Sequence, residues 1–156
     1  MIMDLETARN SAINKFNKLK TKNIICPALK LPVRFWNSWF SHITYKDSKH
    51  RRNEQEQLER FKCFIKVDII IKKSHLYQEH MMKREIVKTR NHWITKEEKI
   101  LVDYYWLVWV VFHNWLESRI KVVLRKAQNK DYLEYFSIIP AWNLEWYRNF
   151  IWIENW

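Results

Sequence analysis

The two histidines of residues 75–80 are the first candidates for metal ligands in this sequence. Zinc-protease helices carry the patterns H-E-x-x-H or H-x-x-E-H, which place both histidines on one face of a helix. Here the segment reads HLYQEH, so that His75 and His80 stand five positions apart. Five residues turn a helix through about 500°, which leaves the two rings about 140° apart around its axis. We therefore predict no metal site and no cofactor.

A pairing of Asp103 with His113 would be another route to catalysis. The two residues stand ten positions apart, which separates them by about 15 Å along a helix. The chain also contains no glycine, and without glycine there is no Walker loop, dinucleotide-binding fingerprint or nucleophile elbow. We predict no catalytic residue, no small-molecule substrate and no enzymatic activity.

A basic cluster at residues 46–52 points to binding instead. Arginine forks match the geometry of phosphate, and each neutralised phosphate releases counterions. Two nearby tryptophans could stack on unpaired bases, because aromatic faces accept any base; core packing is the competing interpretation for them. We predict that these residues contact RNA or another polyanion: Trp36, Trp39, Lys46, Lys49, His50, Arg51 and Arg52.

Charge divides the chain into two segments, which we predict to be its domains. Residues 1–92 hold 20 Lys and Arg against 9 Asp and Glu, so that they carry the whole formal net charge of +11. Residues 93–156 are neutral and contain eight of the ten tryptophans. Tryptophan is enriched at the buried anchors of protein interfaces. We predict contacts with neighbouring protein subunits through Trp106, Trp109, Trp142, Trp146, Trp152 and Trp156.

Hydrophobic periodicity predicts a mainly α fold, with several amphipathic helices around one long apolar helix. Residues 4–20 have apolar residues at helical spacing, with Asp4 as N-cap. The long helix is expected over about 96–126, opened by a capping box of Thr95 and Glu98. Its apolar positions lie almost all round, which indicates burial on every face.

The remaining segments complete this prediction. Residues 23–34, with two of the three prolines, favour an extended basic linker. Residues 75–88 favour a helix, and Pro140 is expected to begin a final helix. Residues 61–71 alternate apolar and polar side chains, which favours one short strand pair; a helix continued from residue 54 is the alternative.

The apolar run at residues 100–116 raises the question of membrane contact. About 17 residues is the lower limit for a helix that crosses a bilayer. Asp103, His113 and Asn114 interrupt the run, and each is costly in hydrocarbon. We interpret it as a buried helix of a water-soluble protein, and peripheral membrane contact stays open.

Composition also suggests where the protein works. Few Gly, Pro and Ala with many Ile, Lys and Asn are typical of an AT-rich genome, such as an organellar one. Cys26 and Cys63 are far apart and form no metal-type spacing or disulfide framework. The N-terminus resembles neither a secretory signal nor a transit peptide. We predict an organelle-encoded mitochondrial protein that is not secreted.

Together these patterns predict a non-enzymatic structural subunit of a large ribonucleoprotein, the organellar ribosome in the first place. Its basic half would contact rRNA and its aromatic half neighbouring proteins. The first alternative is an accessory subunit of a mitochondrial inner-membrane respiratory or ATP synthase complex, with the basic half facing anionic lipid or acidic subunits. The second alternative is a small nucleic-acid-binding regulator.

Overall fold

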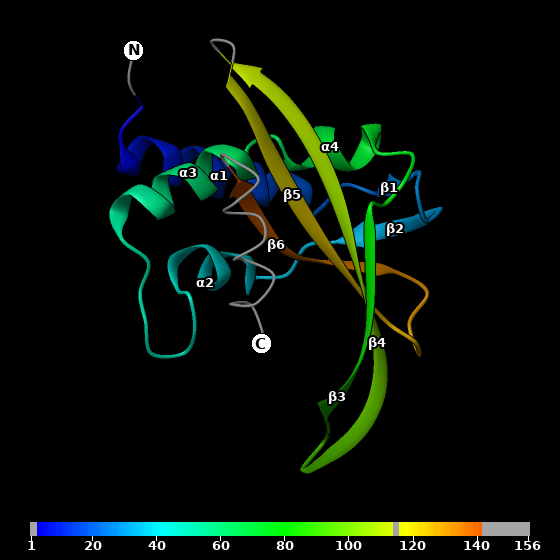
Figure 1. Ribbon diagram of the computed structural model, residues 1–156. Coiled ribbons are helices and arrows are strands. Elements are labelled where there is room, and N and C mark those ends of the chain that lie inside the picture. The colour runs from blue at the N-terminus through cyan, green and yellow to red at the C-terminus, as the bar shows by residue number, and fades with distance from the viewer. Residues whose placement is uncertain (1–2, 114–115, 142–156) are drawn as a thin grey trace.

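A computed structural model describes residues 3–113 and 116–141 of the chain. Within them, four helices and six strands form a helical layer against one mixed sheet (Figure 1). The helices, and then the strands, have these bounds: α1 Leu5–Leu19, α2 Trp39–Thr44, α3 Glu54–Phe64, α4 Val67–Lys73; β1 Ile24–Cys26, β2 Leu31–Arg34, β3 Glu79–Asn91, β4 Ile94–His113, β5 Leu116–Ala127, β6 Leu133–Ala141.

The sheet has the strand order β1-β2-β6-β5-β4-β3. Strands β3, β4, β5 and β6 follow one another as antiparallel neighbours. Strand β2 pairs with β1 in antiparallel fashion and with β6 in parallel. Three strands therefore come from residues 1–92 and three from residues 93–156, and the two segments share one sheet.

The prediction of a mainly α fold is wrong, and the long apolar helix is the main error. The described residues of this range lie in β4 and β5 instead, which pair from Val102↔Ala127 to His113↔Leu116. Successive strand residues point to opposite faces, so Tyr104 and Leu107 are buried on different sides of the sheet. A strand covered on both faces is apolar all round, as a buried helix is. Thr95 caps no helix, because it pairs with Arg90 across the β3–β4 ladder.

The strand pair expected at 61–71 is also wrong. This segment contains the end of α3 and most of α4. Asn53 is the N-cap of α3, where its side chain accepts a hydrogen bond from the Glu56 N–H at 2.8 Å. The buried positions repeat at intervals of three or four residues, as helices require: Phe61, Phe64, Val67, Ile70 and Ile71. The alternative of a helix from residue 54 is confirmed as far as Phe64.

Three further expectations have mixed outcomes. Helix α1 and its N-cap are confirmed, since the Asp4 carboxylate accepts the Thr7 N–H at 2.7 Å. The helix expected at 75–88 is wrong, because β3 occupies most of that range. The expectation that Pro140 begins a helix is wrong, because Pro140 lies within β6; the rest of that expected helix falls at residues 142–156, outside the described part. In the described part, no helix is long and apolar enough to cross a bilayer.

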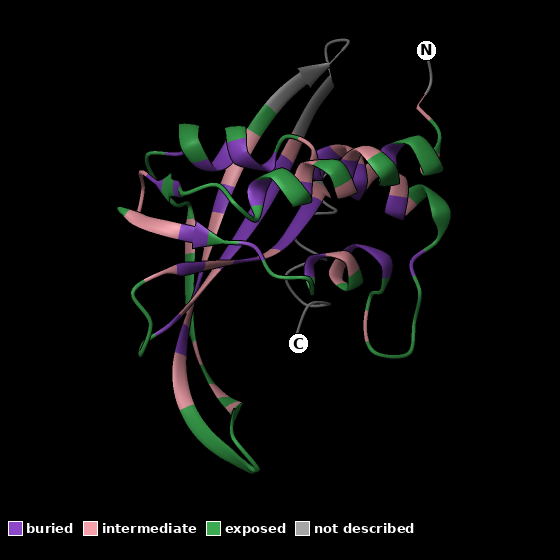
Figure 2. Ribbon diagram, turned by 180° about the vertical axis from the view of Figure 1, so that it is seen from behind, coloured by how far each residue is buried: buried purple, intermediate pink, exposed green. Residues whose placement is uncertain are grey.

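The main core lies between the helices and one face of the sheet (Figure 2). All four helices contribute to it, and so do β1, β2, β4, β5 and β6. Trp39 of α2 lies near its centre, stacked on Phe64 at 4.3 Å and on Phe16 at 5.1 Å between ring centroids. Stacked rings of this kind add to the gain from area burial.

The other face of the sheet carries a network of ion pairs. Lys121 of β5 bonds Glu79 of β3 at 3.2 Å. Arg125 of β5 bridges Glu85 of β3 at 2.7 Å and Glu134 of β6 at 3.0 Å. Tyr104 of β4 donates its hydroxyl hydrogen to the same Glu85. The network therefore joins β3, β4, β5 and β6 side by side.

The two tryptophans near α2 give a direct test of this packing. Trp39 is only 4% exposed and Trp36 is 45% exposed. We expect Trp39→Ala to lower the free energy of unfolding by about 3–5 kcal/mol, because the lost rings leave a cavity. The control Trp36→Ala should change it by less than about 0.5 kcal/mol. Urea unfolding followed by circular dichroism measures both, and similar losses in the two variants would contradict the fold.

Both cysteines should be unreactive toward alkylating reagents in the folded protein. Burial raises the pKa of the Cys63 thiol to about 12 and also raises the pKa of Cys26. Only the thiolate attacks alkylating reagents, so iodoacetamide at pH 8 should leave both residues unmodified for as long as the protein stays folded. In urea both should react, which mass spectrometry detects. Rapid labelling of either residue under native conditions would show that the site is open.

Candidate nucleic-acid interface

The basic cluster found in the sequence forms a closed loop between α2 and α3, residues 45–51. An isolated antiparallel bridge joins Tyr45 to Arg51 at its base. The Lys46 N–H donates to the His50 carbonyl at 2.8 Å, and the Arg52 N–H donates to the Thr44 carbonyl at 2.9 Å. These bonds hold the two sides of the loop together, so that the backbone that carries its cations has a defined position.

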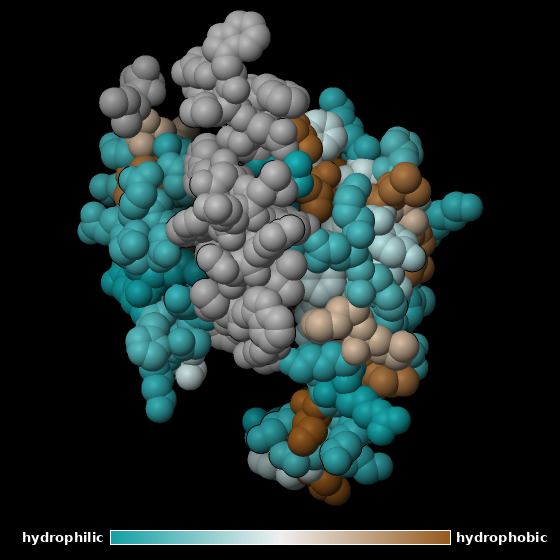
Figure 3. Space-filling model, viewed as in Figure 1, coloured by the Kyte–Doolittle hydropathy of each residue, from teal (hydrophilic) through white to brown (hydrophobic). Residues whose placement is uncertain are grey.

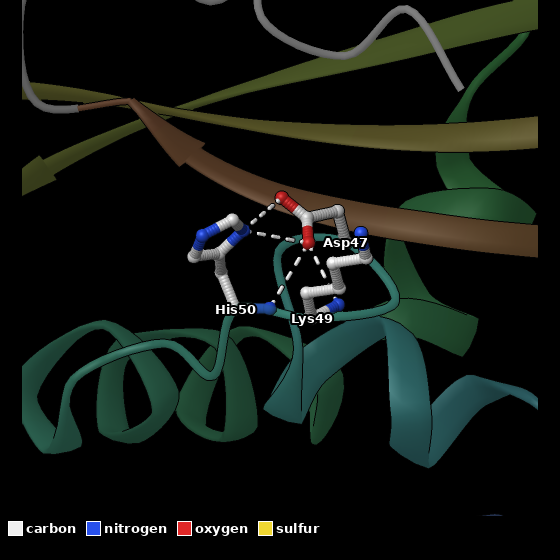
Figure 4. A network of polar contacts seen from close by, with 3 residues as sticks. All are labelled: Asp47, Lys49 and His50. Carbon is white, nitrogen blue, oxygen red and sulfur yellow. Dashed lines mark hydrogen bonds and ion pairs between the residues drawn. The ribbon is translucent and has the colours of Figure 1, made fainter.

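Asp47 organises the interior of this loop (Figure 4). Its carboxylate accepts the backbone N–H of Lys49 at 2.8 Å and of His50 at 2.9 Å, and lies 2.7 Å from His50 Nδ1. The hydrogen bond from the Lys49 backbone is the largest cause of a lowered pKa at Asp47. The carboxylate is thus turned into the loop. Three exposed cations lie in the same loop: Lys46, Lys49 and Arg51.

Two residues of the predicted polyanion site are buried. Trp39 is part of the main core, so its ring faces are covered by Phe16 and Phe64. Arg52 is 5% exposed and lies close enough to His42 to lower the pKa of that imidazole, second to the larger effect of burial. The other predicted members are exposed: Trp36, Lys46, Lys49, His50 and Arg51.

A second basic surface, which sequence reasoning missed, lies on a long β-hairpin. Strand β3 and residues 94–106 of β4 pair continuously from Asn91↔Ile94 to Glu79↔Trp106. We call this hairpin the arm. It extends from the body at the bottom of Figure 1, in the same direction as the loop of residues 45–51. Figure 2 shows that its outer half is exposed.

One face of the arm, which we call the cationic face, carries Arg84, Lys88, Arg90 and Lys99. The register Ile86↔Lys99 places Lys99 on the same side as the even-numbered residues of β3. All four cations are exposed. Lys88 pairs with Glu97 at 3.3 Å. Within the described ranges, no carboxylate pairs with the other three.

The carboxylates of β3 point to the opposite face. Glu79 and Glu85 occupy odd-numbered positions, where they pair with Lys121 and Arg125 of β5. They therefore do not neutralise the cationic face. The alternation of β3 therefore places both of its carboxylates on the face away from the helices, and all of its Lys and Arg residues except Lys83 on the face toward them.

Aromatic side chains gather where the cationic face meets the body. His80 stacks on Tyr105 with 4.8 Å between ring centroids, and Tyr77 lies edge-on to Tyr105 at 5.1 Å. His80 Nε2 lies 2.8 Å from a carboxylate oxygen of Asp103. The pair orients the imidazole, and the Tyr77 ring remains 44% exposed. Aromatic rings therefore lie next to cations where the arm joins the body.

The tryptophans predicted to contact other subunits fall into two groups. Trp109 is half-buried against the main core, with the Lys73 ammonium 5.9 Å from its ring centroid. Trp106 is half-buried in a smaller cluster on the opposite face of the sheet. The others lie outside the described residues: Trp142, Trp146, Trp152 and Trp156.

Comparison with known proteins gives this chain no relative. No family model, curated protein or solved structure matches it. The proposal for the function of this protein therefore rests on the loop of residues 45–51 and on the arm.

Proposed function

We propose that this protein is a non-enzymatic structural subunit of a large ribonucleoprotein, the mitochondrial ribosome in the first place. It binds rRNA through the loop of residues 45–51 and the cationic face of the arm. The observation that carries the proposal is the uncompensated charge of that face. Arg84, Arg90 and Lys99 are exposed cations with no carboxylate partner among the described residues.

Charge of this kind favours a polyanion over other partners. The protein has a formal net charge of +11, which gives a field that attracts phosphate from a distance. Each phosphate that a lysine or arginine neutralises releases a condensed counterion, and this release supplies much of the free energy of binding. Because loop and arm extend in the same direction (Figure 1), one RNA can contact both.

The shape of the arm also supports a partner. A two-stranded hairpin on its own is marginally stable in water, and the outer arm has no third strand beside it. Its exposed apolar side chains lie scattered over a largely hydrophilic surface (Figure 3). Ile86 is 59% exposed and Ile94 is 70% exposed. A ligand that contacts both charge and isolated apolar groups would hold the arm in place.

Neutralising the loop tests the proposal with purified protein. We expect the triple variant Lys46→Gln, Lys49→Gln and Arg51→Gln to bind a structured RNA more weakly than the parent. The slope of log K against log salt should become shallower by about 2 to 3, because three phosphate contacts are lost. Fluorescence anisotropy of labelled RNA across a salt series gives both quantities.

A matched control removes the same charge elsewhere. Lys18, Lys22 and Lys130 are exposed cations outside the loop and the arm, and their replacement by Gln should alter the slope by less. Equal effects of the two triple variants would mean that binding follows net charge alone, and would contradict a defined site.

Fractionation of the source cells separates this proposal from its alternatives. A ribonucleoprotein subunit should sediment with large particles, and RNase should release it. Release by mild detergent but not by RNase would favour a membrane-bound respiratory or ATP synthase assembly. A protein that stays in the light fractions and binds one defined duplex when pure would favour the regulator.

A further inference from the structure

The tip of the arm presents one tryptophan to solvent. Asn91 pairs with Ile94, so that His92 and Trp93 alone form the turn. The backbone of His92 has a φ of 54°, the left-handed region that this kind of turn normally fills with glycine. Trp93 is 93% exposed. A long, continuously paired hairpin therefore holds the indole at its end, with both ring faces open.

Two cations lie close to this indole in the sequence, one on each strand of the arm. Arg90 lies three positions before it and Lys96 three positions after it, and both are exposed. The nearest carboxylate along either strand belongs to Glu97, which pairs with Lys88. Exposed indole faces offer a stacking surface for a base, and nearby cations offer contacts for the phosphates on either side of that base.

We propose that the arm inserts into RNA where a base is unpaired, with Trp93 stacked on that base. Arg84 and Arg90, with Lys99 on the same face of the arm, then follow the phosphates of the adjoining strand. This inference rests on the proposed function and names the RNA feature that the arm selects. The six residue steps of strand from Arg84 to Arg90 span about 20 Å. That span matches about six phosphates at the roughly 3.4 Å rise per nucleotide of a nucleic-acid strand.

Insertion of the same tip into a membrane interface is the alternative. The length of the row of cations that ends at Arg84 argues against it. The polar layer on each side of a bilayer is only about 5–8 Å thick. An arm that enters tip first would leave Arg84, about 30 Å of strand from Trp93, far outside that layer. RNA offers phosphate along the whole row.

Binding of the full-length protein to two RNAs tests the inference. One probe is a stem-loop with a six-nucleotide unpaired purine loop that contains 2-aminopurine, and the other is a blunt duplex with the same paired sequence. We expect Trp93→Ala to weaken binding of the stem-loop about tenfold, which is the range for one lost base–aromatic stack. The affinity for the duplex should change less than about twofold, because phosphate contacts remain.

Two further variants sharpen the result. Trp93→Phe should retain most of the affinity for the stem-loop, since a smaller ring still stacks. Ile69→Ala removes an exposed large apolar side chain of α4, outside the loop of residues 45–51 and the arm, and should leave the preference for the stem-loop unchanged. Quenching of 2-aminopurine on binding should persist in Ile69→Ala and disappear in Trp93→Ala.

The outcomes separate this inference from the proposal beneath it. Failure of the parent protein to bind either RNA would overturn both. Binding of both RNAs with no selective effect of Trp93→Ala would overturn the inference and leave the proposed function standing. A loss of binding to phosphatidylserine vesicles in Trp93→Ala, with RNA binding unchanged, would also overturn it, in favour of membrane insertion. Equal urea midpoints of parent and variant confirm that Trp93→Ala leaves the fold intact.

Discussion

The register between β3 and β4 is the constraint on which the surface chemistry of this protein depends. Side chains of a strand alternate between the two faces of a sheet, and a slip by one residue exchanges those faces completely. In the observed register, Glu85 lies beside Arg125 and Tyr104, while Arg84 lies on the open side. A slip would point the cations at the ion-pair network and the carboxylates at solvent.

The ion pairs between β3 and β5 keep that register in place. Glu79 and Glu85 stand six positions apart on β3 and meet Lys121 and Arg125, which stand four apart on β5. Removing one member of a largely buried pair leaves a charge without compensation, which is costly. Lys121 is only 5% exposed, so the loss of Glu79 would weaken the compensation of a buried charge. The same contacts that stabilise the sheet therefore also keep Glu79 and Glu85 turned away from the cationic face.

Part of this architecture could be predicted from the sequence, namely the segments whose residue pattern fitted only one kind of structure. Asp4 before a helical repeat of apolar residues identified α1. The density of cations at residues 46–52 indicated a polyanion contact, but not the loop that carries it. The apolar run through residues 100–126 fitted a buried helix and a doubly covered strand equally well, because periodicity fails when every position is apolar. Its wealth of Val, Trp and Tyr favoured strands, but the pattern of Thr95 and Glu98 pointed to a helix N-terminus.

The candidate site shows the same division between local and long-range information. Charge along the chain located Lys46, Lys49 and Arg51, because exposed cations need no tertiary partner. Burial of Trp39 and Arg52 depends on residues of α1 and α3, which local sequence does not specify. The arm was not predicted from the sequence, because its turn is formed by His92 and Trp93. The turn lacks the Asn-Gly or Asp-Gly pair that marks a two-residue hairpin.

The parallel pairing of β2 with β6 has a consequence for how the chain reaches its native state. Val33 meets Leu133, about one hundred positions later, so the ends of a very long loop must come together before this part of the sheet exists. Non-local contacts of this kind slow folding, because the entropy of loop closure is lost before the contacts form. During synthesis, the helices emerge well before Tyr135 and Ile138, which complete the core beneath them. The nascent chain thus exposes apolar helix faces until its last third has been made, and an assembly chaperone or early docking on its partner would shorten that interval.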